Sequence, residues 1–222
     1  MTALYFIETM KLENHKALIH TAASSNLGQM LIKICKAAAI PLINVVRDPS
    51  QIALLKDIGA EFVCSTSEAS FDDDLTACIQ ETGATLAFDA TGGGNEGKLA
   101  GQILSEIEKA ILSSTEEFQI YCSDIHKQVY IYGGLDRSPT TLNRSFGMSW
   151  SLGGWLLTPM INKFGVETFK KMRKRIAAEI KTTFASKYYK SISFEEALQP
   201  DIIRPYATQK TGKKYLINPQ KE

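Results

Sequence analysis

Apolar residues along this chain recur with two different periods. Residues 17–22 (ALIHTA) form a short apolar run, which is typical of a buried β-strand. The residues that follow, up to residue 39, place apolar side chains three and four positions apart, as one face of an α-helix requires: Leu27, Met30, Leu31, Ile34 and Cys35. This first unit is therefore predicted to be a strand that runs through a tight loop into a helix.

The same alternation of strand and helix continues to residue 134. Further strands are expected at 41–46, 61–65, 85–94 and 127–134, and helices at 48–60, 70–83 and 96–113. Residues 41–46 (PLINVV) are apolar throughout and rich in β-branched side chains, which suits a strand covered on both faces. Ser50 lies near the start of the second helix, Gly59 lies just past its end, and Gly83 ends the third. Units in this order form right-handed crossovers, so the sequence predicts an α/β fold, a Rossmann-type doubly wound parallel sheet with helices on both faces.

The pattern is looser outside these units. Residues 114–126 are expected to form a polar surface insertion. The uncharged segment 145–162 holds three glycines and a proline and is shorter than the roughly 20 apolar residues of a membrane helix, so it is expected to be buried or interfacial. A basic helix at about 165–181 would keep four apolar residues on one side: Val166, Phe169, Ile176 and Ile180. A strand-like segment, KKYLIN, follows at 213–218.

Composition and charge narrow the possible functions. The chain has 222 residues, of which 44% are hydrophobic and 22% charged, and its formal net charge is +1. Such a balance gives no strong attraction to nucleic acid or to an anionic membrane. The first residues lack the basic start, apolar run and cleavage site of a signal peptide, so a cytoplasmic protein is expected.

Cysteines and histidines give no signal for a metal site. The four cysteines lie far apart in the sequence, with no C-x-x-C pair: Cys35, Cys64, Cys78 and Cys122. A disulfide framework or structural zinc site is therefore not expected, and reduced thiols fit best. His15, His20 and His126 have no partner at metal-ligand spacing and are expected to be solvated or packed. No metal is expected.

Four predicted strands end in segments rich in small or turn-forming residues. These segments are 21–28 (TAASSNLG), 45–49 (VVRDP), 89–94 (DATGGG) and 132–138 (YGGLDRS). The carboxyl ends of parallel strands meet at one edge of the sheet, where ligands bind in folds of this kind. The sequence therefore predicts a nucleotide site at this edge.

The first of these segments could hold a pyrophosphate. Backbone N–H groups at a helix N-terminus attract phosphate, and Ser24, Ser25 and Asn26 could add side-chain hydrogen bonds. Gly28 is expected where the helix packs closest to the sheet. The alternative interpretation is a serine or asparagine cap that merely starts a helix.

The residues after the second strand indicate which nucleotide is bound. Arg47 is suited to a 2′-phosphate, which its guanidinium can grip through two parallel hydrogen bonds, so NADP is favoured over NAD. Alternatively, Arg47 is an exposed cation at a strand end, and Asp48 is either a ribose ligand or a helix cap. Asp89 is more often a structural hydrogen-bond acceptor at such a position. Thr91 is expected, together with the neighbouring glycine, to face the nicotinamide ribose, while the glycines at 133 and 134 could instead form an ordinary turn.

Taken together, these segments resemble the medium-chain dehydrogenase/reductase superfamily. The resemblance rests on HTAASSNLGQMLIKICK, PLINVVRDPSQIALLKDIGAEFV, LAFDATGG, QVYIYGGL and TGKKYLINP. Within the superfamily, the zinc-free quinone-oxidoreductase-like and 2-enoyl thioester reductase branches are the most similar. INVVRD is similar to the second strand of the enoyl reductases, whose arginine serves NADPH.

The resemblance implies a division of the chain and a role for each part. Residues 1–16 would be a linking helix, 17–182 the NAD(P)-binding domain, and 183–222 a tail that in the family returns to a GroES-like catalytic domain. Most substrate contacts, and any catalytic zinc ligands, would then lie outside this sequence. In the family the last strand pairs within the catalytic domain, so 213–218 is expected here to be an unpaired edge or disordered.

The resemblance also assigns cofactor contacts by position. The pyrophosphate would contact Ser24, Ser25, Asn26, Leu27 and Gly28. Arg47 would contact the 2′-phosphate, and Thr91 and Gly92 the ribose on the nicotinamide side. The nicotinamide edge would lie against Gly133, Gly134 and Leu135.

Two functions follow as hypotheses. The first is the cofactor-binding domain of an NADPH-dependent oxidoreductase that transfers hydride to a quinone, carbonyl or activated alkene. The second is a nucleotide-binding or dimerisation module without turnover. Family members often dimerise through this domain, and the stretch around Trp150 and Trp155 could belong to such an interface or to the core. A methyltransferase-like fold is less favoured, because Arg47 would have no phosphate to meet.

Overall fold

The computed structural model describes residues 1–115, 120–186, 188–207 and 214–221. Its centre is a six-stranded parallel sheet with the strand order β3-β2-β1-β4-β5-β6. The strands are β1 (Leu18–Thr21), β2 (Leu42–Val46), β3 (Phe62–Ser65), β4 (Leu86–Asp89), β5 (Lys127–Ile131) and β6 (Trp150–Gly154). The order reverses between β1 and β4, which makes the carboxyl ends of these two strands the switch point of the sheet. The predicted α/β doubly wound fold is confirmed.

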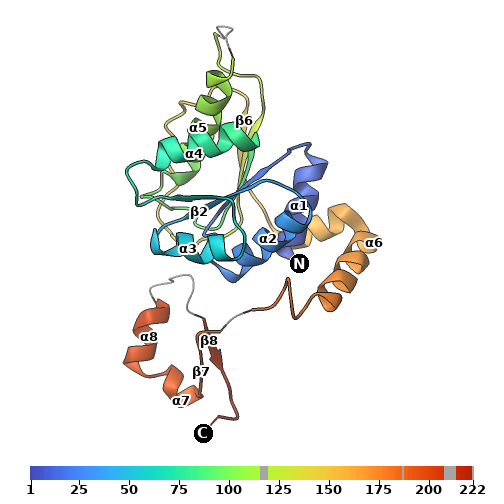
Figure 1. Cartoon of the computed structure of the whole chain (residues 1–222), viewed down its shortest axis with the longest axis vertical. Coiled ribbons are helices and arrows are strands. Elements are labelled where there is room, and N and C mark those ends of the chain that lie inside the picture. The colour runs from blue at the N-terminus through green and yellow to red at the C-terminus, as the bar shows by residue number, and fades with distance from the viewer. Residues whose placement is uncertain (116–119, 187, 208–213, 222) are drawn as a thin grey trace.

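Six helices surround the sheet. They are α1 (Thr2–Leu12), α2 (Asn26–Ala37), α3 (Ser50–Asp57), α4 (Phe71–Thr82), α5 (Leu99–Ser113) and α6 (Leu157–Ala178). The pair α2 and α3 lies on one side of the sheet, and the pair α4 and α5 lies on the other (Figure 1). The alternate direction of side chains along each strand explains the two cores. Leu18 packs with α1 and α2, while its neighbour Ile19 packs with α4 and α5.

The α4–α5 side is closed by a buried ion pair. Lys127, on β5, donates to the carboxylate of Glu108, on α5, over 2.5 Å, and both side chains are excluded from solvent. Ser123 also donates to Glu108, through its backbone N–H and its hydroxyl. These bonds attach the end of the 114–126 insertion to the core. Residues 116–119 of that insertion lie outside the described part, and beside them Ile120 and Tyr121 are strongly exposed, so the surface is less polar than expected.

Residues 145–162 do not form a uniformly buried segment. They contain the edge strand β6, which the sequence did not predict, and its side chains are half-buried or exposed. Trp155 is a core residue, since its indole N–H donates to Thr9 on α1 and its ring packs edge-on against Phe6. Among the described residues, no helix combines the length and the apolar character needed to cross a membrane.

The predicted basic helix is the second part of α6. Gly165 has φ of 81°, and this residue kinks the helix away from the part that begins at Leu157. The prediction that Val166 and Ile180 belong to the apolar side of this helix is wrong, because both side chains are exposed. Instead Met172 is buried in the core, with Ile176 packed against it. The helix predicted at 96–113 begins three residues later, at Leu99, after a turn with left-handed backbone at Asn95 and Glu96.

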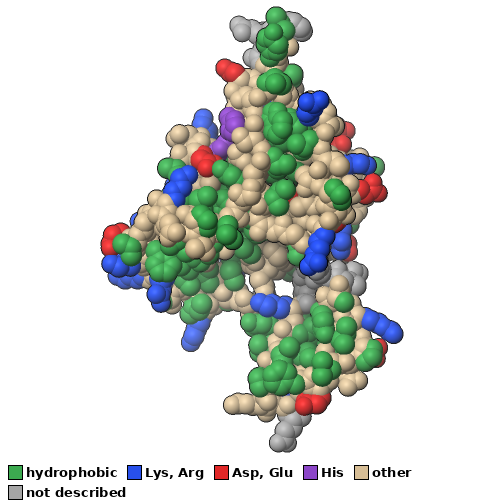
Figure 2. Space-filling model, turned by 180° about the vertical axis from the view of Figure 1, so that it is seen from behind, with side chains coloured by type: hydrophobic (Ala, Val, Ile, Leu, Met, Phe, Trp, Pro, Cys, Tyr) green, Lys and Arg blue, Asp and Glu red, His purple; other side chains and the backbone are tan. Residues whose placement is uncertain are grey.

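The C-terminal residues form a small separate unit. It consists of β7 (Lys190–Ile192), α7 (Phe194–Ala197), α8 (Pro200–Ala207) and β8 (Tyr215–Ile217), and it lies apart from the main sheet (Figure 1). The expectation that 213–218 would be unpaired or disordered is wrong for the described residues 214–218, because β8 pairs in parallel with β7. Residue 213 itself lies outside the described part. Apolar side chains gather on this unit (Figure 2), and the exposed ones include Phe194, Leu198 and Ile217.

Candidate functional site

A cavity of about 120 Å³ lies at the carboxyl edge of the sheet, beside the switch point. It is assembled from the ends of β1, β2, β3 and β4, the first turn of α3 and the segment after β5. The residues that line it are Thr21, Ala22, Val45, Val46, Arg47, Gln51, Thr66, Thr91, Gly94, Asn95, Leu99, Leu135 and Asp136. Three residues predicted from the sequence, Arg47, Thr91 and Leu135, meet here.

The turn from β1 to α2 is tight. Gly28 packs directly against it, since a Cβ on this residue would stand 2.1 Å from the carbonyl oxygen of Ala23. Ala22 has left-handed backbone, with φ of 50°. The close packing expected at Gly28 is thus present, and it fixes the direction in which the first N–H groups of α2 point.

The polar residues of this turn have different surroundings. Ser25 is the N-cap of α2, and its hydroxyl oxygen accepts from the N–H of Gly28 over 3.1 Å. A hydroxyl that accepts in this way keeps its own hydrogen for a ligand. Ser24 is buried, whereas Asn26 and Leu27 are half-exposed in the first helical turn. The first backbone N–H groups of a helix have no acceptor within it, so this turn combines a capped helix with donors for an anion.

Asp89, at the end of β4, holds the switch point together. Its carboxylate accepts from the hydroxyl of Thr21 over 2.6 Å, and from the backbone and side chain of Thr91. The N–H of Gly92 donates to its second oxygen. The structural interpretation favoured for Asp89 is confirmed, and these bonds set the positions of Thr91 and Gly92.

Arg47 and Asp48, which are adjacent in the sequence, make different contacts. Arg47 is exposed at the end of β2 and lines the cavity, and its carbonyl oxygen accepts from the hydroxyls of Ser65 and Ser67. Asp48 accepts from the N–H of Ser50 over 2.9 Å, at the start of α3. That contact corresponds to the helix-cap alternative for Asp48.

One carboxylate, that of Asp136, also lines the cavity. Asp136 accepts from the N–H of Ser138 over 2.9 Å. This bond lowers the pKa of Asp136, and the positive charge of Arg47 lowers it further. A cation and an anion therefore share the cavity.

The remaining predicted residues follow β4 and β5. Gly92 has φ of 74° and is buried, and a Cβ on Gly133 would stand 2.5 Å from the carbonyl oxygen of Ala90. Gly134 is exposed with open space around it. Gly133 borders a second cavity of about 410 Å³, formed by the ends of β5 and β6 and the start of α6. The two glycines after β5 thus lie between the two cavities.

A histidine–tyrosine pair is buried beside the second cavity. Nε2 of His20, on β1, and the hydroxyl of Tyr132 are 2.7 Å apart. Burial lowers the pKa of His20 to about 3, and burial together with the negative charge of Asp89 raises the pKa of Tyr132. Both groups are therefore neutral at physiological pH, and His20 is packed as expected. In the described part of the chain, no three His, Cys, Asp or Glu side chains are grouped to hold a metal ion.

The sequence missed several residues of the first cavity. Thr66 follows β3 directly, and the carboxyl end of this strand reaches the same edge of the sheet as the four strand ends that predicted the nucleotide site. Gln51 lies in the first turn of α3, and Asn95 follows the glycines after β4. The position of Thr66 at a strand end is a signal that could have been used. Gln51 carries no such signal.

Comparison with known proteins gives matches to solved structures. No protein-family model and no curated protein matches the chain. A protein of Mesorhizobium loti assigned as an NADPH:quinone reductase is 24% identical, with a TM-score of 0.73, over 98% of this chain and 57% of its own. An enoyl thioester reductase of Candida tropicalis is 19% identical, with a TM-score of 0.58, over 90% and 53%. Etr1p in complex with NADP and crotonyl-CoA has a TM-score of 0.59 at 19% identity, over 90% and 53%.

The likeness is one of fold. These structures come from the two branches that the sequence motifs resemble, and the chain spans a little over half of their length. The α/β sheet of this chain is therefore the fold of part of these reductases.

Proposed function

We propose that this chain is the cofactor-binding part of an NADPH-dependent oxidoreductase that transfers hydride to a quinone, carbonyl or activated alkene. The observation that carries the proposal is the position of Arg47 in the cavity at the switch point, next to a turn closed by Gly28. An arginine at the end of the second strand accommodates a 2′-phosphate in folds of this type. The fold shared with an NADP-bound reductase supports the same assignment.

Each part of the site has a binding task in this proposal. The first turn of α2, with Ser25 and Asn26, holds the pyrophosphate, and Arg47 holds the 2′-phosphate. Thr91 and the neighbouring glycine, fixed by Asp89, contact the ribose on the nicotinamide side. The segment 133–135 lies along the nicotinamide edge.

When bound, the nicotinamide supplies the hydride, and the protein orients it and excludes water. In this proposal, the residues of this chain that form the site bind and position the cofactor.

Calorimetric titration tests the proposal. The chain should bind NADPH more tightly than NADH, and Arg47→Ala should weaken NADPH binding by roughly 10- to 100-fold, because a hydrogen bond to a charged group contributes about 1.5–3 kcal/mol. NADH binding should change little. Arg173→Ala, which removes an exposed cation on α6, is the matched control and should leave both affinities unchanged. No NADPH binding by the unaltered chain would refute the proposal, and equal affinities for the two nucleotides would refute the role of Arg47.

The alternative is a module that binds the nucleotide without turnover. Because most substrate contacts are expected outside this chain, the oxidation of NADPH has to be assayed on the protein encoded by the complete gene, with quinone and 2-enoyl thioester acceptors. Oxidation that depends on the acceptor supports the reductase, whereas tight NADPH binding without oxidation by that protein supports the module. The exposed edge of β6 suggests a place where a second copy could pair in either case.

A further inference from the structure

Two cysteines that are 14 positions apart in the sequence lie side by side in the fold. The Sγ atoms of Cys64, on β3, and Cys78, on α4, are 3.7 Å apart. Cys64 is buried, and Cys78 is half-buried on the side of α4 that faces the sheet. A disulfide bond is about 2.05 Å long, so the two sulfurs need to approach by roughly 1.7 Å to form one.

We propose that Cys64 and Cys78 form a reversible thiol–disulfide pair, with Cys78 as the thiol that meets the oxidant and Cys64 as the one that resolves it. The oxidant is a peroxide. The thiolate of Cys78 attacks one peroxide oxygen, the O–O bond breaks, and Cys78 becomes a sulfenic acid. The hydroxide that leaves takes up the proton that Cys78 had released and becomes water. The sulfur of Cys64 then attacks the sulfur of Cys78, the S–O bond breaks, and a second water leaves with the proton of Cys64. Two thiols and one hydrogen peroxide thus give one disulfide and two waters.

The surroundings of the two sulfurs support this order. Cys78 is the more accessible, and a hydrogen bond from Cys64 lowers the pKa of Cys78 while the same bond raises that of Cys64. The thiolate is the reactive form of a cysteine, so Cys78 is the better nucleophile.

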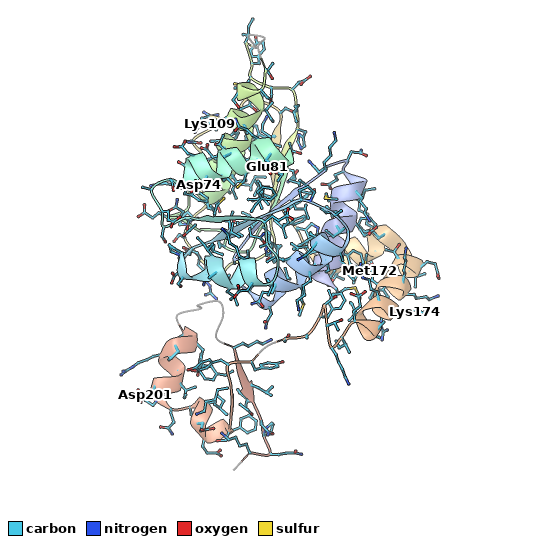
Figure 3. The ribbon with its side chains drawn as sticks, viewed as in Figure 1. Asp74, Glu81, Lys109, Met172, Lys174 and Asp201 are labelled. Carbon is cyan, nitrogen blue, oxygen red and sulfur yellow. The ribbon has the colours of Figure 1, made fainter. Side chains whose placement is uncertain are left out.

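Acidic side chains select the kind of oxidant. Asp74 and Glu81, which are labelled on α4 in Figure 3, precede and follow Cys78 in the sequence of that helix, and both disfavour its thiolate. Their negative charge also repels anionic oxidants such as glutathione disulfide, whereas hydrogen peroxide is neutral. A small uncharged oxidant is therefore the expected reactant.

The position of the pair connects it to the cavity. Residues 66–70 join β3 to α4, and this connection lies between the two cysteines. It carries Thr66, which lines the cavity, and Ser67, whose hydroxyl donates to the carbonyl oxygen of Arg47. Closing the disulfide therefore constrains the segment beside Arg47. A change in NADPH affinity rests on the proposed function, whereas the disulfide itself does not.

Intact mass and peptide mapping test the disulfide. The reduced full chain is treated with a small excess of hydrogen peroxide, and the remaining thiols are alkylated under denaturing conditions. We expect the loss of two alkylation sites and of about 2 Da, both restored by dithiothreitol. Trypsin cannot separate the cysteines because no Lys or Arg lies between Lys56 and Lys98, whereas cleavage after Glu68 places them on different peptides that stay joined until reduction.

Three variants assign the roles. Cys122→Ser, the control at another half-buried thiol, should form the disulfide as the unaltered chain does. Cys64→Ser should leave a sulfenic acid on Cys78 that dimedone traps, and Cys78→Ser should leave Cys64 unoxidised. The proposal is overturned if both thiols stay alkylatable in the unaltered chain, or if Cys78 instead joins Cys122 or a second chain. Oxidised and reduced protein should differ at least threefold in NADPH affinity, and equal affinities would overturn the connection to Arg47.

Discussion

The close packing of α2 against the β1–α2 turn can be tested with one methyl group. In Gly28→Ala the new Cβ would stand 2.1 Å from the carbonyl oxygen of Ala23. Non-bonded heavy atoms have their optimum at about 3.5–4.0 Å, so the first turn of α2 must move by roughly 1.4 Å. The three atoms nearest to the methyl group are all backbone atoms of Ala23, so no side-chain rotation can relieve the contact.

This displacement should lower both the stability of the chain and its affinity for NADPH. Overpacking of this kind costs about 1–3 kcal/mol, and the better helix propensity of alanine offsets up to about 1 kcal/mol of it. A net loss of about 1–2 kcal/mol is therefore expected. For a chain of this size, 1 kcal/mol corresponds to about 2–4 °C, so the melting temperature should fall by roughly 2–8 °C. The same shift moves the N–H groups of the turn away from the phosphates, and the loss of one such bond weakens NADPH binding at least about tenfold.

Calorimetry at a temperature where circular dichroism shows both proteins folded measures the second effect separately. Gly154→Ala is the matched control, because its Cβ would meet open space, its backbone needs no left-handed φ, and it is not among the residues assigned to the cofactor. That variant should melt within about 2 °C of the unaltered chain and bind NADPH within about threefold. If Gly28→Ala melted and bound like Gly154→Ala, the turn would not hold the phosphates.

Three further predictions concern the cavity, the core and the edge of the sheet. Asp136→Asn should tighten NADPH binding by a few-fold and NADH binding less, since its carboxylate opposes a phosphate beside Arg47, and parallel titrations measure the ratio. Lys127→Met should cost about 3–5 kcal/mol by leaving Glu108 buried and unpaired, and a second change, Glu108→Gln, should recover part of that loss in urea unfolding. Burial alone would raise the pKa of Glu108, but the bond from Lys127 and its neighbours lower it, so this stabilisation is complete at neutral pH and disappears as the pH falls through that lowered pKa. If two copies pair through β6, light scattering should show a dimer, and Gly154→Lys, where a side chain meets open space, should shift it to monomer.

The sequence was sufficient for those parts of the fold that depend on local patterns. Residues 42–46 are buried on both faces, and their run, which is apolar except for Asn44, predicted a strand covered on both faces. The helix that begins at Asn26 was predicted from apolar spacing, and the serine cap that the sequence offered as an alternative to phosphate binding is present at Ser25. In these segments the local pattern and the final burial agree.

Other elements depend on contacts that no local pattern specifies. The strand β6 alternates between apolar and polar residues only over its first three positions and ends in two glycines, so its sequence is a weak strand signal and its pairing with β5 supplies the order. β8 pairs with a strand more than 20 positions earlier, and that pairing follows only once the unit has folded. In the same way, Cys64 and Cys78 show no sequence motif, and their proximity depends on how α4 packs against β3.

In the candidate site, two adjacent residues show what the sequence indicates and what only the tertiary structure decides. From the sequence, either Arg47 or Asp48 could have faced a ribose, since both follow β2. The backbone N–H of Ser50 engages the carboxylate of Asp48 at the start of α3, while Arg47 lines the cavity with Asp136 beside it. A carboxylate that accepts from the first turn of a helix is engaged there, whereas an exposed guanidinium gains from a phosphate. The proposed preference for a phosphorylated ribose therefore rests on the guanidinium of Arg47, which the sequence indicated, and on the start of the neighbouring helix, which only the structure shows.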